Sequence, residues 1–254
     1  MPQFAVIIPA AGKSSRFGGM EKKPFVSLDG RPVWQRTAEQ FWSRPDVSKV
    51  YLVIAPEDRD DFRRRFGALV GFVHSERIEV VDGGAERFES VANALARVPE
   101  KVPLVAVHDA VRPLVTPSLI DAVVQGAGEH GAAMLAVPVA DTLKQVEPAT
   151  NRITGTVPRA GVWQAQTPQV FRRDWLVEAY SKRSSLTVPI TDDAQLIEAL
   201  GHAVVVVPGS PVNFKITTKD DLALAEAVLK ARTAKVTPPP SEPKWGAFDD
   251  DAKW

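Results

Sequence analysis

Short apolar runs alternate with amphipathic stretches along most of the chain. The apolar runs are bounded by Gly, Pro or charged residues, which is typical of buried strands. We expect strands at residues 4–8, 50–55, 78–81, 102–107, 132–137, 163–171, 203–207 and 214–216. The amphipathic stretches predict helices at residues 31–43, 58–66, 86–98, 117–130, 174–181, 192–200 and 219–232. This alternation predicts an α/β fold with a mostly parallel sheet flanked by helices on both faces.

Residues 140–161 interrupt the alternation. Two short extended runs, residues 142–146 and 152–157, flank the turn-rich sequence EPATN at residues 147–151. Both runs are too polar for a buried core, so the segment is predicted to be a β-hairpin arm that projects from the main sheet.

The length of 254 residues fits one large domain with a small appendage. We expect the domain to span residues 1–234. Residues 235–254 carry three consecutive prolines and an acidic run, and they are expected to form a disordered tail.

Charge and composition exclude several classes of protein. Lys and Arg together number 31, as do Asp and Glu, so no global field favours nucleic acid or an anionic membrane. No stretch approaches 18 apolar residues, and the absence of cysteine excludes disulfides and thiolate chemistry. We therefore expect a soluble cytoplasmic protein.

Polar loops follow three of the predicted strands, at residues 9–15, 82–84 and 108–113. In parallel α/β sheets, ligands bind beyond the carboxyl ends of the strands, so these loops are expected to form one site. The first loop contains Pro9, Ala10, Ala11 and Gly12, and a tight turn of small residues lets the backbone N–H groups of its non-proline residues face an anion such as phosphate. Its glycine spacing fits neither a Walker A motif nor a dinucleotide fingerprint, which disfavours a dinucleotide-dependent oxidoreductase.

The sequence PAAGKSSRF, followed by lysine, resembles the signature of the sugar-nucleotide pyrophosphorylase superfamily. Within it, the chain is most similar to the cytidylyltransferases that make CDP-methylerythritol in non-mevalonate isoprenoid synthesis. Four later segments also match that family: HDAVRP at 108–113, QTPQVF at 166–171, ITDDA at 190–194 and NFKIT at 213–217. The resemblance implies a Rossmann-like, glycosyltransferase-A-like nucleotidyltransferase fold that binds CTP and 2-C-methyl-D-erythritol 4-phosphate.

The resemblance also implies which residues bind the nucleotide. They are Pro9, Ala10, Ala11, Gly12, Gly83, Gly84, Ser90, Asp109 and Ala110. Of these residues, Ser90 and the loop that contains Gly83 and Gly84 are expected to contact the cytosine base. Ala85 stands where many members of the family carry an acidic residue.

Asp109 follows a buried strand, where a carboxylate needs a partner for its charge. A ribose hydroxyl, a metal-bound phosphate or Arg112 would each serve. The resemblance places Asp109 between the ribose and the acceptor. Mg²⁺ is expected to bridge the triphosphate oxygens, with no protein ligand assigned beyond Asp109 as a candidate. The resemblance also implies that Arg112, Lys215, Thr142 and Arg159 bind the acceptor, the last two from an arm that crosses to a second subunit of a homodimer.

The chemistry implied is attack of a phosphate oxygen on the α-phosphorus of CTP. A phosphate monoester is already a nucleophile, so positive charge rather than a general base should lower the barrier. The candidates are Arg16, Lys23 and Lys215, with Lys22 a rival to Lys23 because this chain has Lys-Lys-Pro where the family usually has Pro-Lys-Gln. We expect His108 to be a structural residue and not a catalytic base.

Two other functions stay open on the sequence alone. Closely similar cytidylyltransferases use ribitol 5-phosphate as the acceptor, which also offers a phosphate and a polyol chain. A catalytically silent nucleotide-binding module could share the same fold.

Overall fold

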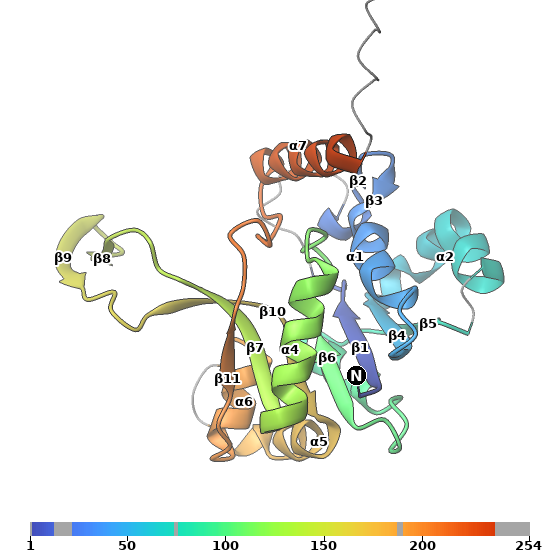
Figure 1. Ribbon diagram of the computed structural model, residues 1–254, viewed down its shortest axis with the longest axis horizontal. Coiled ribbons are helices and arrows are strands. Elements are labelled where there is room, and N and C mark those ends of the chain that lie inside the picture. The colour runs from blue at the N-terminus through green and yellow to red at the C-terminus, as the bar shows by residue number, and fades with distance from the viewer. Residues whose placement is uncertain (1, 13–21, 74–75, 187–189, 237–254) are drawn as a thin grey trace, which may run out of the picture.

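The computed structural model describes residues 2–12, 22–73, 76–186 and 190–236. Across these residues the main sheet has seven strands in the order β11-β7-β10-β6-β1-β4-β5 (Figure 1). They are β1 (Phe4–Pro9), β4 (Val47–Ile54), β5 (Ile78–Asp82), β6 (Leu104–Val107), β7 (Ala132–Pro138), β10 (Trp163–Arg172) and β11 (Val205–Pro208). Neighbouring strands are parallel except that β10 runs antiparallel to both β6 and β7. The expected mostly parallel sheet is confirmed.

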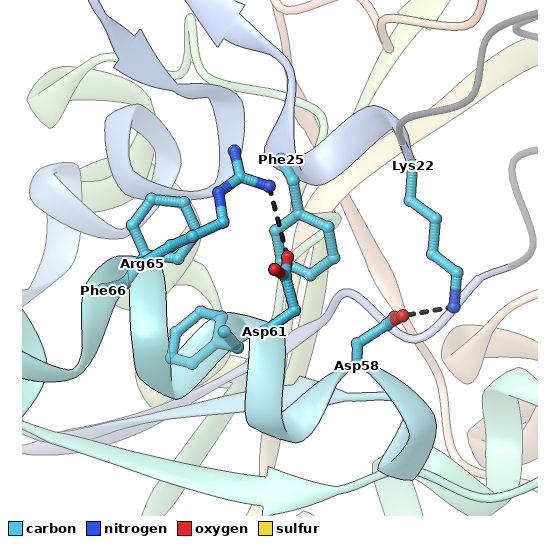
Figure 2. Close-up of a pocket in the computed structure, with 7 residues that line it drawn as sticks. Lys22, Phe25, Asp58, Asp61, Arg65 and Phe66 are labelled. Atoms are coloured by element: carbon cyan, nitrogen blue, oxygen red, sulfur yellow. Dashed lines mark hydrogen bonds and ion pairs between the residues drawn. The ribbon is translucent and has the colours of Figure 1, made fainter.

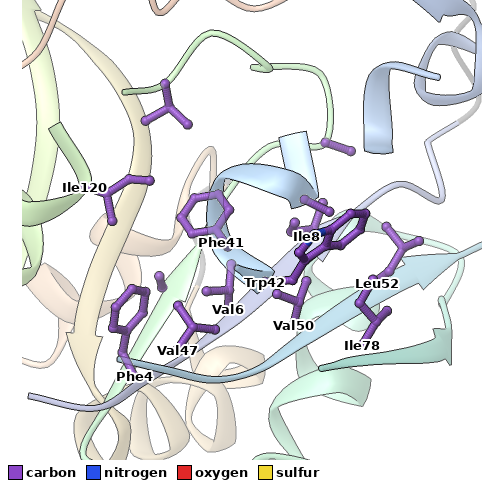
Figure 3. Close-up of a cluster of buried hydrophobic side chains, with 14 of the residues drawn as sticks. Phe4, Val6, Ile8, Phe41, Trp42, Val47, Val50, Leu52, Ile78 and Ile120 are labelled. Carbon is purple, nitrogen blue, oxygen red and sulfur yellow. The ribbon is translucent and has the colours of Figure 1, made fainter. Parts of the chain in front are cut away.

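Helices cover both faces of this sheet. Successive side chains of β1 enter opposite layers: Phe4, Val6 and Ile8 join one apolar cluster, and Ala5 and Ile7 join another. The first cluster, part of which is drawn in Figure 3, contains residues of α1 (Val33–Trp42), α2 (Arg59–Ala68) and α4 (Pro117–His130). The second contains residues of α3 (Arg87–Leu95), α5 (Arg173–Ser181) and α6 (Asp193–Ala199). Burial on both faces explains why the strands read as continuous apolar runs.

A third, smaller cluster holds the last helix against the body. Helix α7 (Lys219–Val236) packs beside the short strand β2 (Ser27–Leu28), which pairs with β3 (Arg31–Pro32). The buried residues of this third cluster are Leu28, Val33, Val111, Leu114, Ile216 and Ala225. Because Ile216 packs in this cluster, the loop that carries Lys215 lies next to the loop that follows β6.

The predicted arm is a two-stranded antiparallel hairpin of β8 (Leu143–Glu147) and β9 (Arg152–Val157). It projects away from the main sheet, to the left in Figure 1. Its residues are almost all exposed, as the polar sequence predicted.

Several short elements complete the fold. They are the 3₁₀ turns η1 (Lys23–Phe25), η2 (Pro56–Asp58) and η4 (Arg183–Ser185) and the π-helical turn η3 (Leu69–Val73). Among the described residues, no helix has the length and hydropathy needed to cross a membrane.

The strand expected at residues 214–216 is absent from the structure, and this prediction was wrong. The segment makes a single backbone contact of sheet-like length, from Ile216 N–H to the carbonyl of Val111 at 2.9 Å. Its apolar residues face the small cluster under α7, so their burial comes from a loop that packs on a helix. The last helix also runs four residues past its expected end at Arg232.

Candidate active site

A cleft of about 650 Å³ opens at the carboxyl ends of β1, β4, β5 and β6, the edge of the sheet expected from the polar loops. Each of these strands contributes the residues that directly follow it. The lining residues are Pro9, Ala10, Ala11, Gly12, Lys23, Pro24, Ala55, Pro56, Glu57, Gly83, Gly84, Ala85, Glu86, Arg87, Ser90, Asp109, Ala110, Val111 and Lys215.

Most of the predicted site residues meet in this cleft. All nine predicted nucleotide-binding residues line it, together with Lys23 and Lys215. Arg112 lies behind the lining and contacts Asp109. Arg16 falls outside the described residues.

The loop after β5 approaches the loop after β1 closely. A Cβ atom on Gly83 would lie 2.7 Å from Cβ of Ala11 and 2.9 Å from Oγ of Ser90, so no larger residue fits without displacement. Gly84 N–H donates to Ser90 Oγ at 3.1 Å, and the Ser90 hydroxyl donates to the Glu86 carbonyl at 3.2 Å. Glu86 caps α3 through a capping box. These contacts fix the shape of the loop before any ligand binds.

Asp109 is nearly buried and surrounded by cations. Its Oδ2 lies 3.1 Å from Lys215 Nζ and 3.3 Å from Arg112 Nε, and its Oδ1 lies 3.9 Å from a terminal nitrogen of Arg87. Burial acts to raise the pKa of Asp109, but the charges of Lys215, Arg87 and Arg112 together outweigh it and hold the pKa well below its usual range. Asp109 is therefore a fixed negative charge at neutral pH.

Arg87 was not predicted from the sequence. It is the first residue of α3 and donates to the buried carboxylate of Asp193 at 2.8 Å. One sequence gives no signal for this role, because an arginine at a helix start usually faces solvent.

His108 is part of a buried hydrogen-bond network that joins three of the recognised segments. Its Nε2–H donates to the Arg112 carbonyl at 3.1 Å, which leaves Nδ1 to accept from the Thr167 hydroxyl at 3.1 Å. The Thr167 oxygen in turn accepts from Asp109 N–H at 3.0 Å. Asn213 donates to the Thr167 carbonyl at 2.9 Å. Burial lowers the pKa of His108 to about 4, so the ring is neutral and structural, as expected.

The two adjacent lysines have different surroundings. Lys22 Nζ donates to Asp58 at 2.6 Å and to Glu57 at 3.3 Å. Figure 2 shows Lys22 directed at Asp58 on the rim of a second pocket, of about 360 Å³, that Phe25 helps to line. Lys23 begins η1 and lines the main cleft. Of the two lysines, only Lys23 lines the main cleft, and Lys22 lines the second pocket.

Thr142 and Arg159 are exposed at the base of the arm, and neither lines the cleft of its own chain. Arg159 donates to the carbonyl of Ala140, which joins the two loop segments that connect the arm to the main sheet. Within one chain, the arm residues and the cleft are therefore separate.

The described residues of the cleft offer few ligands for a metal ion, so a magnesium ion there would depend chiefly on substrate phosphates. Among the described residues, no three His, Asp or Glu side chains gather as a metal site of their own. Mg²⁺ is commonly bound by one or two carboxylates together with phosphate oxygens and water, and Asp109 offers one such carboxylate.

Comparisons with known proteins agree with this geometry. The profile of the family described as 2-C-methyl-D-erythritol 4-phosphate cytidylyltransferase matches residues 4–231. A protein of that name from Bacillus velezensis is 43% identical over 232 residues, which cover 91% of this chain and 97% of the relative. Another, from Salinibacter ruber, is 46% identical over 226 residues, which cover 89% of this chain and 92% of the relative.

A crystal structure of the Francisella tularensis 2-C-methyl-D-erythritol 4-phosphate cytidylyltransferase is also similar, with a TM-score of 0.74 and 33% identity. The alignment covers 89% of this chain and 99% of that one. The profile match and the relatives each span nearly all of the described domain, so the chain belongs to the 2-C-methyl-D-erythritol 4-phosphate cytidylyltransferase family.

Proposed function

We propose that the cleft transfers the cytidylyl group of CTP to 2-C-methyl-D-erythritol 4-phosphate, giving 4-diphosphocytidyl-2-C-methyl-D-erythritol and pyrophosphate. Membership of the family supports this reaction. The observation that carries it is the meeting of Lys23 and Lys215 with the small-residue loop at Pro9–Gly12 in one cleft. Two cations beside a loop of small residues, which lets a ligand approach the backbone closely, suit the binding of a triphosphate beside a second phosphate.

In this reaction an acceptor phosphate oxygen forms a bond to the α-phosphorus of CTP. The bond from that phosphorus to the bridging oxygen breaks, and pyrophosphate leaves with the electron pair. Lys23 and Lys215 would offset the negative charge that gathers on the oxygens around phosphorus, with Arg16 as a third cation. The carboxylate of Asp109 stays ionised and would accept a hydrogen bond from a hydroxyl group of the bound substrates. Arg112 would hold this carboxylate in place.

The hydroxyl of Ser90 supports a preference for cytosine over uracil. Its hydrogen is committed to the Glu86 carbonyl and one lone pair to Gly84 N–H. What is left toward the cleft is an acceptor, which pairs with an amino group and not with a carbonyl oxygen. Cytosine carries an amino group where uracil carries a carbonyl, so CTP should bind better than UTP.

We propose Mg²⁺ as the cofactor, bound by the triphosphate and by Asp109. When bound, the ion supplies positive charge to the phosphate oxygens.

The arm is proposed to complete the site of a second subunit. Thr142 and Arg159 are exposed and apart from the cleft of their own chain, and the arm carries exposed apolar side chains at Val146, Ile153 and Val157. A homodimer through the arm would cover those side chains and bring Arg159 to the partner's acceptor phosphate.

Pyrophosphate release tests the proposed function. The purified protein is incubated with Mg²⁺ and CTP, and with methylerythritol phosphate or ribitol 5-phosphate in parallel. Release with methylerythritol phosphate and not with ribitol phosphate is expected. A preference for ribitol phosphate would reassign the acceptor. Binding of CTP without release from either acceptor would contradict catalysis and leave a nucleotide-binding module.

A further inference from the structure

Arg87 lies between two carboxylates, one buried beneath the cleft and one in it. A terminal nitrogen of Arg87 is 2.8 Å from Asp193 Oδ2 and 3.9 Å from Asp109 Oδ1. The side chain of Asp193 is 1% exposed and that of Arg87 is 37% exposed. Arg87 therefore connects a fully buried anion to the anion that faces the substrates.

Asp193 holds the guanidinium in a fixed place. Its Oδ2 accepts from Arg87, and its Oδ1 accepts from the hydroxyl of Tyr180. Asp193 begins α6, Tyr180 lies on α5 and Arg87 begins α3, so three helices converge on this contact.

The two oxygens of Asp109 are used differently. Oδ2 lies within 3.3 Å of both Lys215 and Arg112, whereas Oδ1 faces Arg87 at 3.9 Å. That distance is too long for a hydrogen bond but short enough for attraction between charges. Because Asp193 holds Arg87 at this distance, Arg87 steadies the charge on Oδ1 without occupying its lone pairs.

We propose that Arg87, held by Asp193 and Tyr180, is a positioning residue for the reaction and keeps Asp109 Oδ1 oriented and open to a substrate hydroxyl. This rests on the proposed function, in which Asp109 contacts the substrates. The guanidinium acts through Asp109, so its removal should matter only while that carboxylate is present.

A double-mutant cycle tests this dependence. The variants are Arg87→Met, Asp109→Asn and the pair together, each assayed for kcat and KM with both substrates. Arg87→Met alone should lower kcat/KM for the acceptor by about 10-fold or more, the scale of a lost charge partner. In the Asp109→Asn background the same change should cost at most about 3-fold.

A purely structural role for Arg87 predicts a different result. If the arginine only holds α3 against α6, the fold-losses in kcat/KM of Arg87→Met and Asp109→Asn should multiply in the double variant. That outcome would overturn the proposal. Arg87→Met with unchanged kcat/KM would overturn it as well. Arg87→Lys should recover part of the lost kcat/KM because it restores a positive charge near Oδ1.

The control and the fold check use other side chains of the chain. Arg172→Met removes a surface ion pair with Asp174. Arg172 lies beside Leu104 at the start of β6, whereas the cleft lies at the other end of that strand. The substitution should leave kcat/KM unchanged. Melting curves followed by circular dichroism establish that each variant is folded. Tyr180→Phe should loosen Arg87 with a smaller loss than Arg87→Met, because Asp193 and its charge stay in place.

The cycle also separates this proposal from the proposed function. If the wild-type protein makes no 4-diphosphocytidyl product, the proposed function fails, and the same cycle is run on the dissociation constant of CTP by calorimetry. Coupling of Arg87 and Asp109 in CTP binding would sustain the positioning role, and independent effects would refute it.

Discussion

At the scale of single residues, Lys22 and Lys23 show how two identical side chains acquire different roles. The ammonium of Lys22 bonds to Asp58 and Glu57 on η2, which fastens the start of η1 to the body. Lys23 is directed by the first turn of η1 to the cleft. Adjacent lysines thus differ in their surroundings, one paired with carboxylates beside the cleft and the other lining the cleft.

We predict that Lys23→Ala lowers kcat by about 10²-fold or more, because a cation that offsets the negative charge developing around the α-phosphorus in the transition state is lost. Steady-state pyrophosphate release measures the effect. The matched variant is Lys22→Ala, which removes the same group one residue earlier and should cost much less. Equal losses in the two variants would contradict the assignment of Lys23.

His108 makes the stability of the protein depend on pH. Its pKa is about 4 in the folded chain, against an ordinary value near 6.5. The unfolded chain therefore binds a proton at a higher pH than the folded chain. The stabilisation is fully present above about pH 6.5 and is lost as the pH falls toward 4.

We predict that this one residue removes about 3 kcal/mol of unfolding free energy between pH 7 and pH 4. Urea unfolding of wild type and His108→Gln at both pH values measures it, because a neutral glutamine should remove that share of the pH dependence. His130→Gln, at an exposed histidine, is the control. The low pKa of Asp109 acts in the same direction but below this window. An unchanged pH dependence in His108→Gln would be inconsistent with a buried neutral ring.

At the scale of elements, we propose that the arm acts on the cleft of a neighbouring subunit. Arg159→Ala should chiefly raise KM for the acceptor phosphate. If the arm completes the partner's cleft, then Lys23 and Arg159 of one site come from different subunits.

Subunit mixing measures this arrangement. Random pairing of Arg159→Ala and Lys23→Ala subunits should restore about a quarter of wild-type activity, because half of the dimers are mixed and one of their two sites is intact. Each variant dimer alone provides the baseline. No recovery after verified exchange of subunits would place both residues in one subunit's site.

The sequence predicted helices and strands correctly where the apolar residues of a segment follow one clear pattern. The buried strands and amphipathic helices were found with boundaries within a few residues, and residues 117–130 form α4 as expected. The strand expected at residues 214–216 was wrong because Phe214 and Ile216, the two apolar residues on either side of Lys215, can also be buried by packing under a helix. The spacing of apolar residues indicates which positions are buried, but in a short segment it does not indicate whether a sheet or a helix covers them.

At the scale of the whole molecule, we predict that the arm sets the oligomeric state. Ile153 is 64% exposed and pairs in register with Val146, which is 41% exposed. Ile153→Asp should raise the dissociation constant of the dimer by about 10-fold or more, because a charge would be buried in the interface. Sedimentation equilibrium measures it. Leu224→Asp, at a 54% exposed leucine on α7, should leave the association unchanged.

The position of the cleft was predictable as a whole, whereas its finer organisation was not. Polar loops after parallel strands meet at one edge, so Gly83 and Asp109 were expected together. The pairing of Arg87 with Asp193 joins residues 106 positions apart through side chains alone. The hydrogen bonds of Thr167 to Asp109 and His108 could not be predicted either. Thr167 lies within a strand, and the sequence does not say which strands lie beside it.

Strand β10 lies between β6 and β7, although both of these precede it in the chain. As the chain emerges from the ribosome, β1, β4, β5 and β6 can pair as soon as residue 107 is available. The free edge of β6, with the apolar sequence LVAV, then stays without its neighbour until residues 163–172 follow. An unpaired apolar edge is a site for aggregation. The growing chain is therefore most vulnerable during the synthesis of the 55 or so residues between β6 and β10, when chaperones would have the most to protect.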